Sequence, residues 1–166
     1  MRKLALGIIV VTLTLFSGCN PEDTSESNYQ TAYITTKGDL SQGGFDFSEG
    51  IARRDSLADM IVEPWVGDNG EPAPGILHNA WGDSTKKIID LGQVNLEDVI
   101  DLDPSGMTPD TTQMDMWTVE KPMAGHAYYI TTLENYDAFF FIDSLKVTPD
   151  SISYTTDLWI KYIIIK

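Results

Sequence analysis

The segment that most constrains the fold is residues 152–165 (ISYTTDLWIKYIII). β-Branched and aromatic residues dominate it, and neither glycine nor proline interrupts it, which is typical of a strand. Successive side chains of a strand point to opposite faces. One alternating set contains Leu158 and Ile160 and the other contains Trp159 and Ile163, so both sets are largely apolar. This pattern predicts a strand inside a sheet that is covered on both faces.

The chain from residue 29 onward carries the same signal in shorter pieces. Its apolar runs are separated by Gly, Pro, Asn and Asp, and almost none of them recurs at helical spacing. Short polar connectors at 134–137 and 148–151 favour antiparallel hairpins between the last three strands. The strands expected before the final one are residues 29–36, 45–47, 58–65, 86–91, 114–119, 126–133 and 138–147.

One segment, residues 95–102 (NLEDVIDL), favours a helix of two turns at most. Asn95 can cap it, and acidic residues suit its first turn. Residues 66–75 hold three glycines and two prolines and predict a loop, while residues 76–89 are ambiguous up to the strand at 86. The expected fold class is therefore mainly β, a single domain at 29–166 built as an antiparallel sandwich or a barrel-like sheet, with one short helix.

The chain begins with the layout of a secretory signal. Arg2 and Lys3 precede an apolar run of 13 residues at 4–16 and then two small residues. A permanent membrane helix needs about 20 apolar residues to cross a bilayer of about 30 Å, and this run is shorter. We therefore expect residues 1–18 to be a signal peptide that is removed.

Cys19 is the only cysteine and follows this leader directly. Residues 15–19 (LFSGC) resemble the bacterial lipobox. The resemblance implies that Cys19 is diacylated on sulfur, becomes the new N-terminus and is then acylated on its amine. One acyl chain gives marginal membrane binding, whereas two or three give stable attachment. Cys19 is thus predicted to be a lipid anchor, the alternative being an ordinary thiol.

The residues after the anchor predict a flexible acidic tether at 19–28. It contains no large apolar side chain that could repay the entropy of ordering. Asn20 is not the aspartate that retains lipoproteins at the inner membrane of enteric bacteria. Glu22 and Asp23 resemble the acidic cluster that directs some lipoproteins to the outer face. The expected location is the cell envelope, at the outer membrane, with exposure at the cell surface left open.

Charge excludes one class of partner. The formal net charge of the chain is −14, and loss of Arg2 and Lys3 with the leader takes it to −16. A protein that neutralises phosphates needs a basic surface, so nucleic-acid binding is excluded. The same acidity argues against attachment to anionic lipid through basic residues. The membrane, reached through Cys19, is the one partner that the sequence predicts.

No motif supports catalysis. The sequence contains no G-x-S-x-G, H-E-x-x-H, Walker-type or C-x-x-C pattern. Asp98, Asp101, Asp103 and Asp110 surround Gly106, but their spacing does not match a calcium-binding loop. We expect these carboxylates to cap loops and the helix end, and we expect a non-catalytic protein without a cofactor or a metal site.

Two histidines and four tryptophans are the remaining candidates for binding. His126 opens a predicted strand and is expected to be a hydrogen-bonded structural residue, while His78 lies in the ambiguous segment. The alternative is that His78 and His126 clamp a haem axially. The tryptophans could form a carbohydrate-stacking platform, but their spread along the chain favours core and sheet-face packing. These four residues are Trp65, Trp81, Trp117 and Trp159.

Several short motifs resemble those of a loosely defined set of secreted bacterial lipoproteins. The motifs are residues 43–50 (GGFDFSEG), 58–62 (ADMIV), 89–94 (IDLGQV), 104–106 (PSG) and 125–132 (GHAYYITT). The best-understood similar proteins are the HmuY-like haem-scavenging lipoproteins, which are β-rich and anchored at the surface. The resemblance implies a fold and a location more than an activity.

The function that these features favour is a lipid-anchored envelope protein acting as a binding or structural surface module. Two alternatives stay open, namely a haem-binding lipoprotein and a polysaccharide-binding surface protein.

Overall fold

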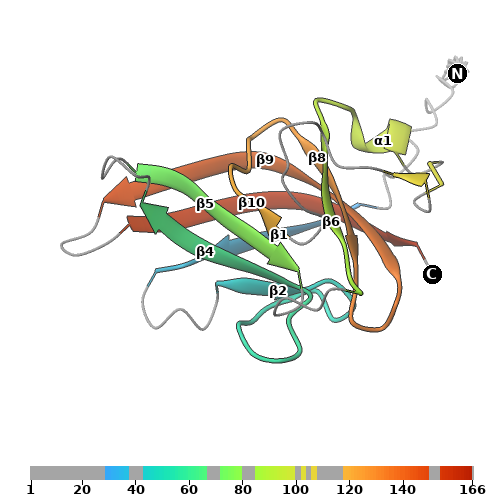
Figure 1. Ribbon diagram of the computed structural model, residues 1–166, viewed down its shortest axis with the longest axis horizontal. Coiled ribbons are helices and arrows are strands. Elements are labelled where there is room, and N and C mark those ends of the chain that lie inside the picture. Colours follow the sequence, from blue (N-terminus) through green and yellow to red (C-terminus); the bar gives the residue numbers. More distant parts are fainter. Residues whose placement is uncertain are drawn as a thin grey trace, which may run out of the picture.

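The fold is a β-sandwich of two five-stranded antiparallel sheets (Figure 1). A computed structural model describes residues 29–37, 43–66, 72–79, 85–99, 102–103, 106–107, 118–149 and 154–165. The predicted mainly β class and the antiparallel sandwich are confirmed. The barrel-like alternative is wrong, because the strands form two separate sheets that do not close on each other.

Sheet A contains the two longest strands at its centre, in the order β1-β10-β9-β8-β6. The expected hairpins are present, since β9 pairs antiparallel with both β8 and β10. The strands of sheet A are β1 (Gln30–Thr35), β6 (Ile88–Gly92), β8 (Ala127–Thr131), β9 (Asp137–Pro149) and β10 (Tyr154–Ile165).

Sheet B has the order β3-β2-β4-β5-β7 and shorter strands. Two of them differ from the expectation, because β3 had no counterpart and β5 occupies part of the predicted loop at 66–75. The strands of sheet B are β2 (Gly44–Asp46), β3 (Ile51–Ala52), β4 (Met60–Val66), β5 (Pro72–Asn79) and β7 (Thr118–Val119). The other residues of the strand expected at 114–119 lie outside the described residues.

Proline is tolerated in β5 because, among the described strands, only β4 pairs with the start of this strand. β4 pairs with β5 along its length, whereas β7 meets β5 only at Leu77 and His78. A proline lacks the N–H group that a second neighbour would need, so it is confined to such edges. Pro72 and Pro74 lie before the segment that β7 reaches.

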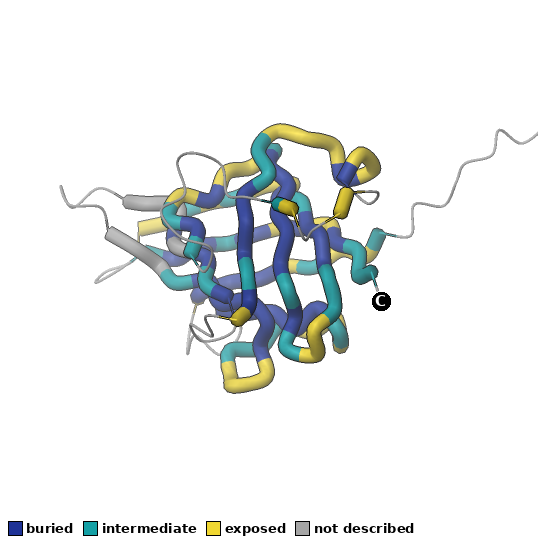
Figure 2. Tube along the Cα trace, turned by 45° about the vertical axis from the view of Figure 1, so that its right-hand side comes forward, coloured by how far each residue is buried: buried dark blue, intermediate teal, exposed yellow. Residues whose placement is uncertain are grey.

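The main core lies between the two sheets. Figure 2 shows the buried strands crossing the middle of the molecule, with exposed segments at its rim. An aromatic cluster in this core joins both sheets: the Tyr162 ring packs edge-on against Phe45 and Phe47, and Phe140 stacks on Tyr128. Fully burying one such side chain contributes about 1.5–3 kcal/mol, so this cluster is a large part of what holds the sheets together.

A smaller second core lies on the outer face of sheet A, turned away from sheet B. The helix α1 (Leu96–Val99), shorter than the expected 95–102, buries Leu96 and Val99 there. The final strand was expected to be covered on both faces, and this is wrong for much of its length. Ile163 and Ile165 pack against the second core, but Trp159 is exposed.

Within the described residues, no helix has the length and apolar character needed to cross a membrane. The predicted signal peptide, Cys19 and the tether at 19–28 lie outside the described residues.

Candidate functional site

The outer face of sheet A is covered at one end and open at the other. At the covered end, α1 packs over Ile89, Tyr129 and Phe139. At the open end, where β1 and β10 pair, Tyr33 is 46% exposed and Trp159 is 40% exposed. Single exposed apolar residues are normal on protein surfaces, but grouped ones mark interaction sites.

Tyr33 and Trp159 form one aromatic unit. They are direct partners across the β1–β10 pairing, so their side chains leave the sheet side by side. Their ring centroids lie 4.9 Å apart with the planes tilted by 36°. We call this unit the aromatic pair.

Hydrogen bonds to Asp157 fix the position of Tyr33. The Tyr33 hydroxyl donates to Asp157 Oδ1 at 2.7 Å, and the Thr35 hydroxyl donates to the same oxygen at 2.6 Å. Because both bonds are made to a charged acceptor, they are stronger than bonds between neutral groups. The aromatic pair is therefore held in place before any ligand arrives.

An ion pair borders the other side of Trp159. Lys161 Nζ lies 3.0 Å from Asp143 Oδ1, and both side chains are partly exposed. Asp143 occupies a bulge in β9, because Trp159 pairs with Ser144 and the next residue of β10 pairs with Ile142. Charged and hydroxyl groups thus flank the aromatic pair along β10.

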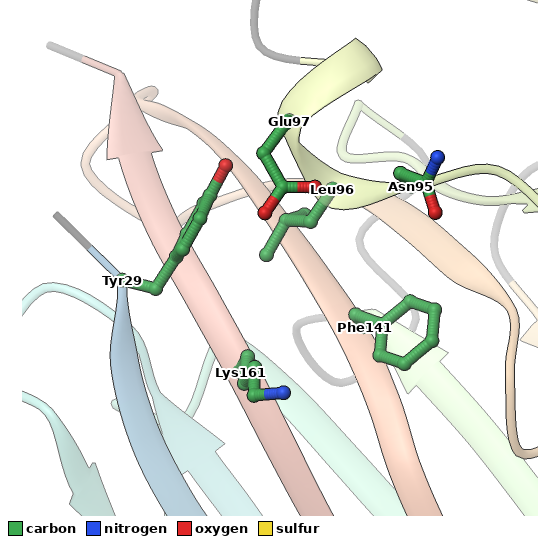
Figure 3. A pocket seen from close by; sticks show the side chains of 6 residues that line it. All are labelled: Tyr29, Asn95, Leu96, Glu97, Phe141 and Lys161. Atoms are coloured by element: carbon green, nitrogen blue, oxygen red, sulfur yellow. The ribbon is translucent and has the colours of Figure 1, made fainter. Parts of the chain in front are cut away.

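Two hollows flank the aromatic pair along β10, one on each side of it. The first, of about 170 Å³, lies beside α1, where Leu96 and Glu97 project over the sheet between Tyr29, Phe141 and Lys161 (Figure 3). The pKa of Tyr29 is raised by burial of its hydroxyl and by the nearby carboxylates of Glu97 and Asp98.

The second hollow, of about 370 Å³, lies at the opposite end of β10, and we call it the lysine hollow. Asp157 belongs to its wall and also holds Tyr33, so this hollow adjoins the aromatic pair directly. The residues that line it are Lys37, Lys146, Thr148, Pro149, Thr155 and Asp157.

His126 lies between the sheets at the start of β8 and is only 7% exposed. Its Nδ1 atom lies 3.0 Å from Asp90 Oδ1, and the Gly92 N–H group donates to that same oxygen at 2.8 Å. Tyr128 lies next to this pair, and its burial and the charge of Asp90 raise its pKa. His126 is thus a buried, hydrogen-bonded residue.

His78 lies on the outer face of sheet B. Its Nε2 atom is 3.4 Å from Glu63 Oε2 and its Nδ1 atom is 3.4 Å from the Thr118 hydroxyl. Glu63 also pairs with Arg54 at 2.9 Å. The fold therefore places His78 and the inward-facing His126 on different faces, and the two imidazoles are not brought together as axial ligands of one haem.

The other candidates from the sequence gain little from the structure. No group of three or more His, Cys, Asp or Glu side chains in the described segments could hold a metal ion. Asp101 and Asp110 lie outside the described residues, as does Cys19. Among the four tryptophans, Trp159 alone has a described side chain, and its exposure contradicts the packing role expected for it.

The aromatic pair itself was not predicted from the sequence. A signal for it exists, because Asp157 and Lys161 share the alternating set of Trp159 and so place charged groups on its face of the strand. What this face can do chemically is stack a flat apolar surface on two rings and offer hydrogen bonds and charges beside them. No family model, curated protein or solved structure matches the chain.

Proposed function

We propose that this protein is a lipid-anchored, non-catalytic binding module of the bacterial envelope, and that the open part of the outer face of sheet A binds polysaccharide. The observation that carries the proposal is the aromatic pair, Tyr33 and Trp159, exposed on a sheet face between two hollows.

The chemistry of the aromatic pair suits a sugar ring. The C–H bonds on one side of a pyranose carry partial positive charge, and an aromatic face carries partial negative charge. The hydroxyl groups at the edge of the sugar need hydrogen-bond partners, and the carboxylates of Asp157 and Asp143 lie on either side of Trp159. Rings and carboxylates together therefore match both kinds of surface that a sugar presents.

The pair is also prepared for binding. Ordering a side chain at an interface costs about 0.5–1.5 kcal/mol, and a side chain that is already fixed avoids most of that cost. Tyr33 is fixed by its hydrogen bond to Asp157 and by contact with Trp159. Rigid aromatic side chains of this kind often supply most of the binding energy of an interface.

The anchor and the binding face are compatible in space. β1 begins beside α1, whereas β9 ends and β10 begins at the other end of the sandwich (Figure 1). A tether of ten residues at 19–28 reaches at most about 35 Å. With Cys19 in the outer membrane, the tether would join the domain at its α1 end, so the lysine hollow would lie at the end farther from the point of attachment.

Affinity electrophoresis of the full-length, detergent-solubilised protein in gels that contain single soluble polysaccharides tests the proposal. We expect the wild-type protein to be retarded by at least one glycan, and Trp159→Ala and Tyr33→Ala to weaken that binding at least tenfold. Leu57→Ala is the control, because Leu57 is an exposed apolar residue (54%) that lies between β3 and β4 of sheet B.

The proposal is overturned if the wild-type protein is retarded by none of the glycans. It is also overturned if both aromatic variants bind as tightly as Leu57→Ala. Circular dichroism of each variant tests whether the fold is retained. Where it is, a loss of binding is caused by the change on the outer face of sheet A and not by unfolding.

A further inference from the structure

We infer that the polysaccharide is acidic, and that the lysine hollow binds its carboxylate or sulfate groups while the aromatic pair stacks on a neighbouring sugar ring. This inference rests on the proposed function and names the class of ligand. It is carried by the charges that the fold gathers beside Trp159.

The two lysines of the hollow are available to a ligand. Among the described residues, Arg53, Arg54 and Lys161 are paired with carboxylates, and Lys86 is buried against Asn135. Lys37 and Lys146 are exposed, line the same hollow and form no ion pair within the described part of the chain.

This arrangement is unusual for the composition of the chain. Acidic residues outnumber basic ones by 25 to 11. Two lysines in one hollow, with no ion pair to any described residue, therefore form a local positive site on a molecule that is otherwise strongly acidic. Such a site attracts an anion by its local field and, because the rest of the surface is acidic, favours one position for it.

The carboxylate of Asp157 does not cancel this site. Its Oδ1 atom already accepts hydrogen bonds from the hydroxyls of Tyr33 and Thr35, which partly neutralise it. The hydroxyls of Thr148 and Thr155, which pair across β9 and β10, line the hollow and can donate to an oxyanion. Among the described residues that line the hollow, two lysines and two threonines thus accompany one acidic side chain.

The spacing fits a polymer that lies along β10. Residues 157 and 159 on the same face of a strand lie about 7 Å apart, so the hollow and the Trp159 ring can contact neighbouring sugars. A charged group held by the lysines would place the next ring over the aromatic pair. The acidic group and the stacked ring therefore belong to one continuous ligand.

The test compares three probes with the full-length protein in detergent: polygalacturonate, which carries carboxylates, dextran sulfate, which carries sulfates, and neutral dextran. At low salt we expect at least tenfold tighter binding to one or both acidic polymers than to dextran, and the two acidic arms show which anion is preferred. The double variant Lys37→Gln/Lys146→Gln should lose this preference.

The matched control is the double variant Lys87→Gln/Lys121→Gln, which removes the same charge outside the hollow. It should bind like the wild-type protein. Raising the salt concentration should weaken binding of the wild type and leave the residual binding of the hollow variant nearly unchanged, because screening acts on the lysines.

The outcomes separate this inference from the proposed function. Binding to dextran that is as tight as binding to the acidic polymers overturns the acidic ligand and leaves the proposal of glycan binding intact. An equal loss of binding to the acidic polymers in both lysine double variants has the same consequence. Absence of binding to all three probes, together with a negative glycan series, overturns both.

Discussion

Asp59 and Leu133 connect the two sheets: Asp59 Oδ1 accepts a hydrogen bond of 2.6 Å from the backbone N–H of Leu133. Asp59 immediately precedes β4 of sheet B, and Leu133 follows β8 of sheet A. The other oxygen, Oδ2, accepts a bond of 2.8 Å from Phe47 N–H, and the side chain is completely buried. One carboxylate thus satisfies two backbone donors that would otherwise be left without partners.

Asp59→Asn should destabilise the protein. An asparagine places an NH₂ group where one of the two backbone N–H donors now finds an oxygen, so a buried donor loses its partner. Such a loss costs about 1–3 kcal/mol. Urea unfolding of the wild type and of Asp59→Asn measures the difference, and Asp55→Asn on the exposed loop nearby should change stability less. Equal stability of Asp59→Asn and wild type would contradict the role assigned to this carboxylate.

The same residue should make stability depend on pH. Burial, with smaller contributions from Glu134 and Asp46, raises the pKa of Asp59 from 3.8 to about 6, against the opposing effect of its two backbone hydrogen bonds. Because the pKa is raised in the folded state, the group adds stability below about pH 4 and loses it as the pH rises through about 6. The stability of the wild type relative to Asp59→Asn should increase by about 1–3 kcal/mol between pH 7 and pH 4. A difference that stays constant across this range would refute the prediction.

Gly75→Ala should weaken the pairing of β4 and β5. Gly75 has a φ of +95°, which residues other than glycine rarely adopt. An added Cβ would lie 2.9 Å from the Glu63 carbonyl oxygen. We expect a loss of about 1–2 kcal/mol from the backbone conformation alone. Gly106→Ala, where nothing lies within 4 Å of an added Cβ, is the control. Thermal unfolding of both variants gives the comparison, and equal midpoints would count against it.

Haemin should not bind through the two histidines. His126 is held by Asp90 between the sheets, and His78 is held by Glu63 and Thr118 on the outer face of sheet B. We expect that titration with haemin shifts the Soret band no more in the wild type than in His78→Ala or His126→Ala. A histidine-dependent shift would restore the haem-binding alternative.

Cys19→Ala should abolish lipid attachment. In cells labelled with radioactive palmitate, we expect the wild-type protein to carry label and to sediment with the outer membrane, and Cys19→Ala to do neither. Ser25→Ala, a change in the same tether, should behave like the wild type. Equal labelling of Cys19→Ala would show that the cysteine is not the anchor.

The strand pattern could be predicted because alternation is a local property. Residues 126–133, 138–147 and 152–165 each carry it, and each contains a strand of sheet A. β5 could not be predicted in the same way. Whether Pro72 can lie in a strand depends on where β7 ends beside it, and β7 is about 40 residues away in sequence.

The residues that contact the site residues could not be predicted from the sequence for a related reason. Alternation shows that Asp157, Trp159 and Lys161 share a face, but what covers that face depends on where α1 packs. Likewise, His126 meets Asp90 only because β8 pairs with β6. The sequence of neither segment indicates that the two strands pair.

The placement of β10 between β1 and β9 sets a condition on how the protein folds. β1 and β10, the first and last described strands, are direct neighbours, and Gln30 pairs with Tyr162. Contacts between residues so distant in sequence require a large loop to close before they give any stabilisation, which slows folding. Before β10 is added to sheet A, Tyr162 cannot pack against Phe45 and Phe47. Until then, this strand does not cover the two phenylalanine rings. Until β10 has joined sheet A, the partly folded chain would thus stay open to chaperones and proteases.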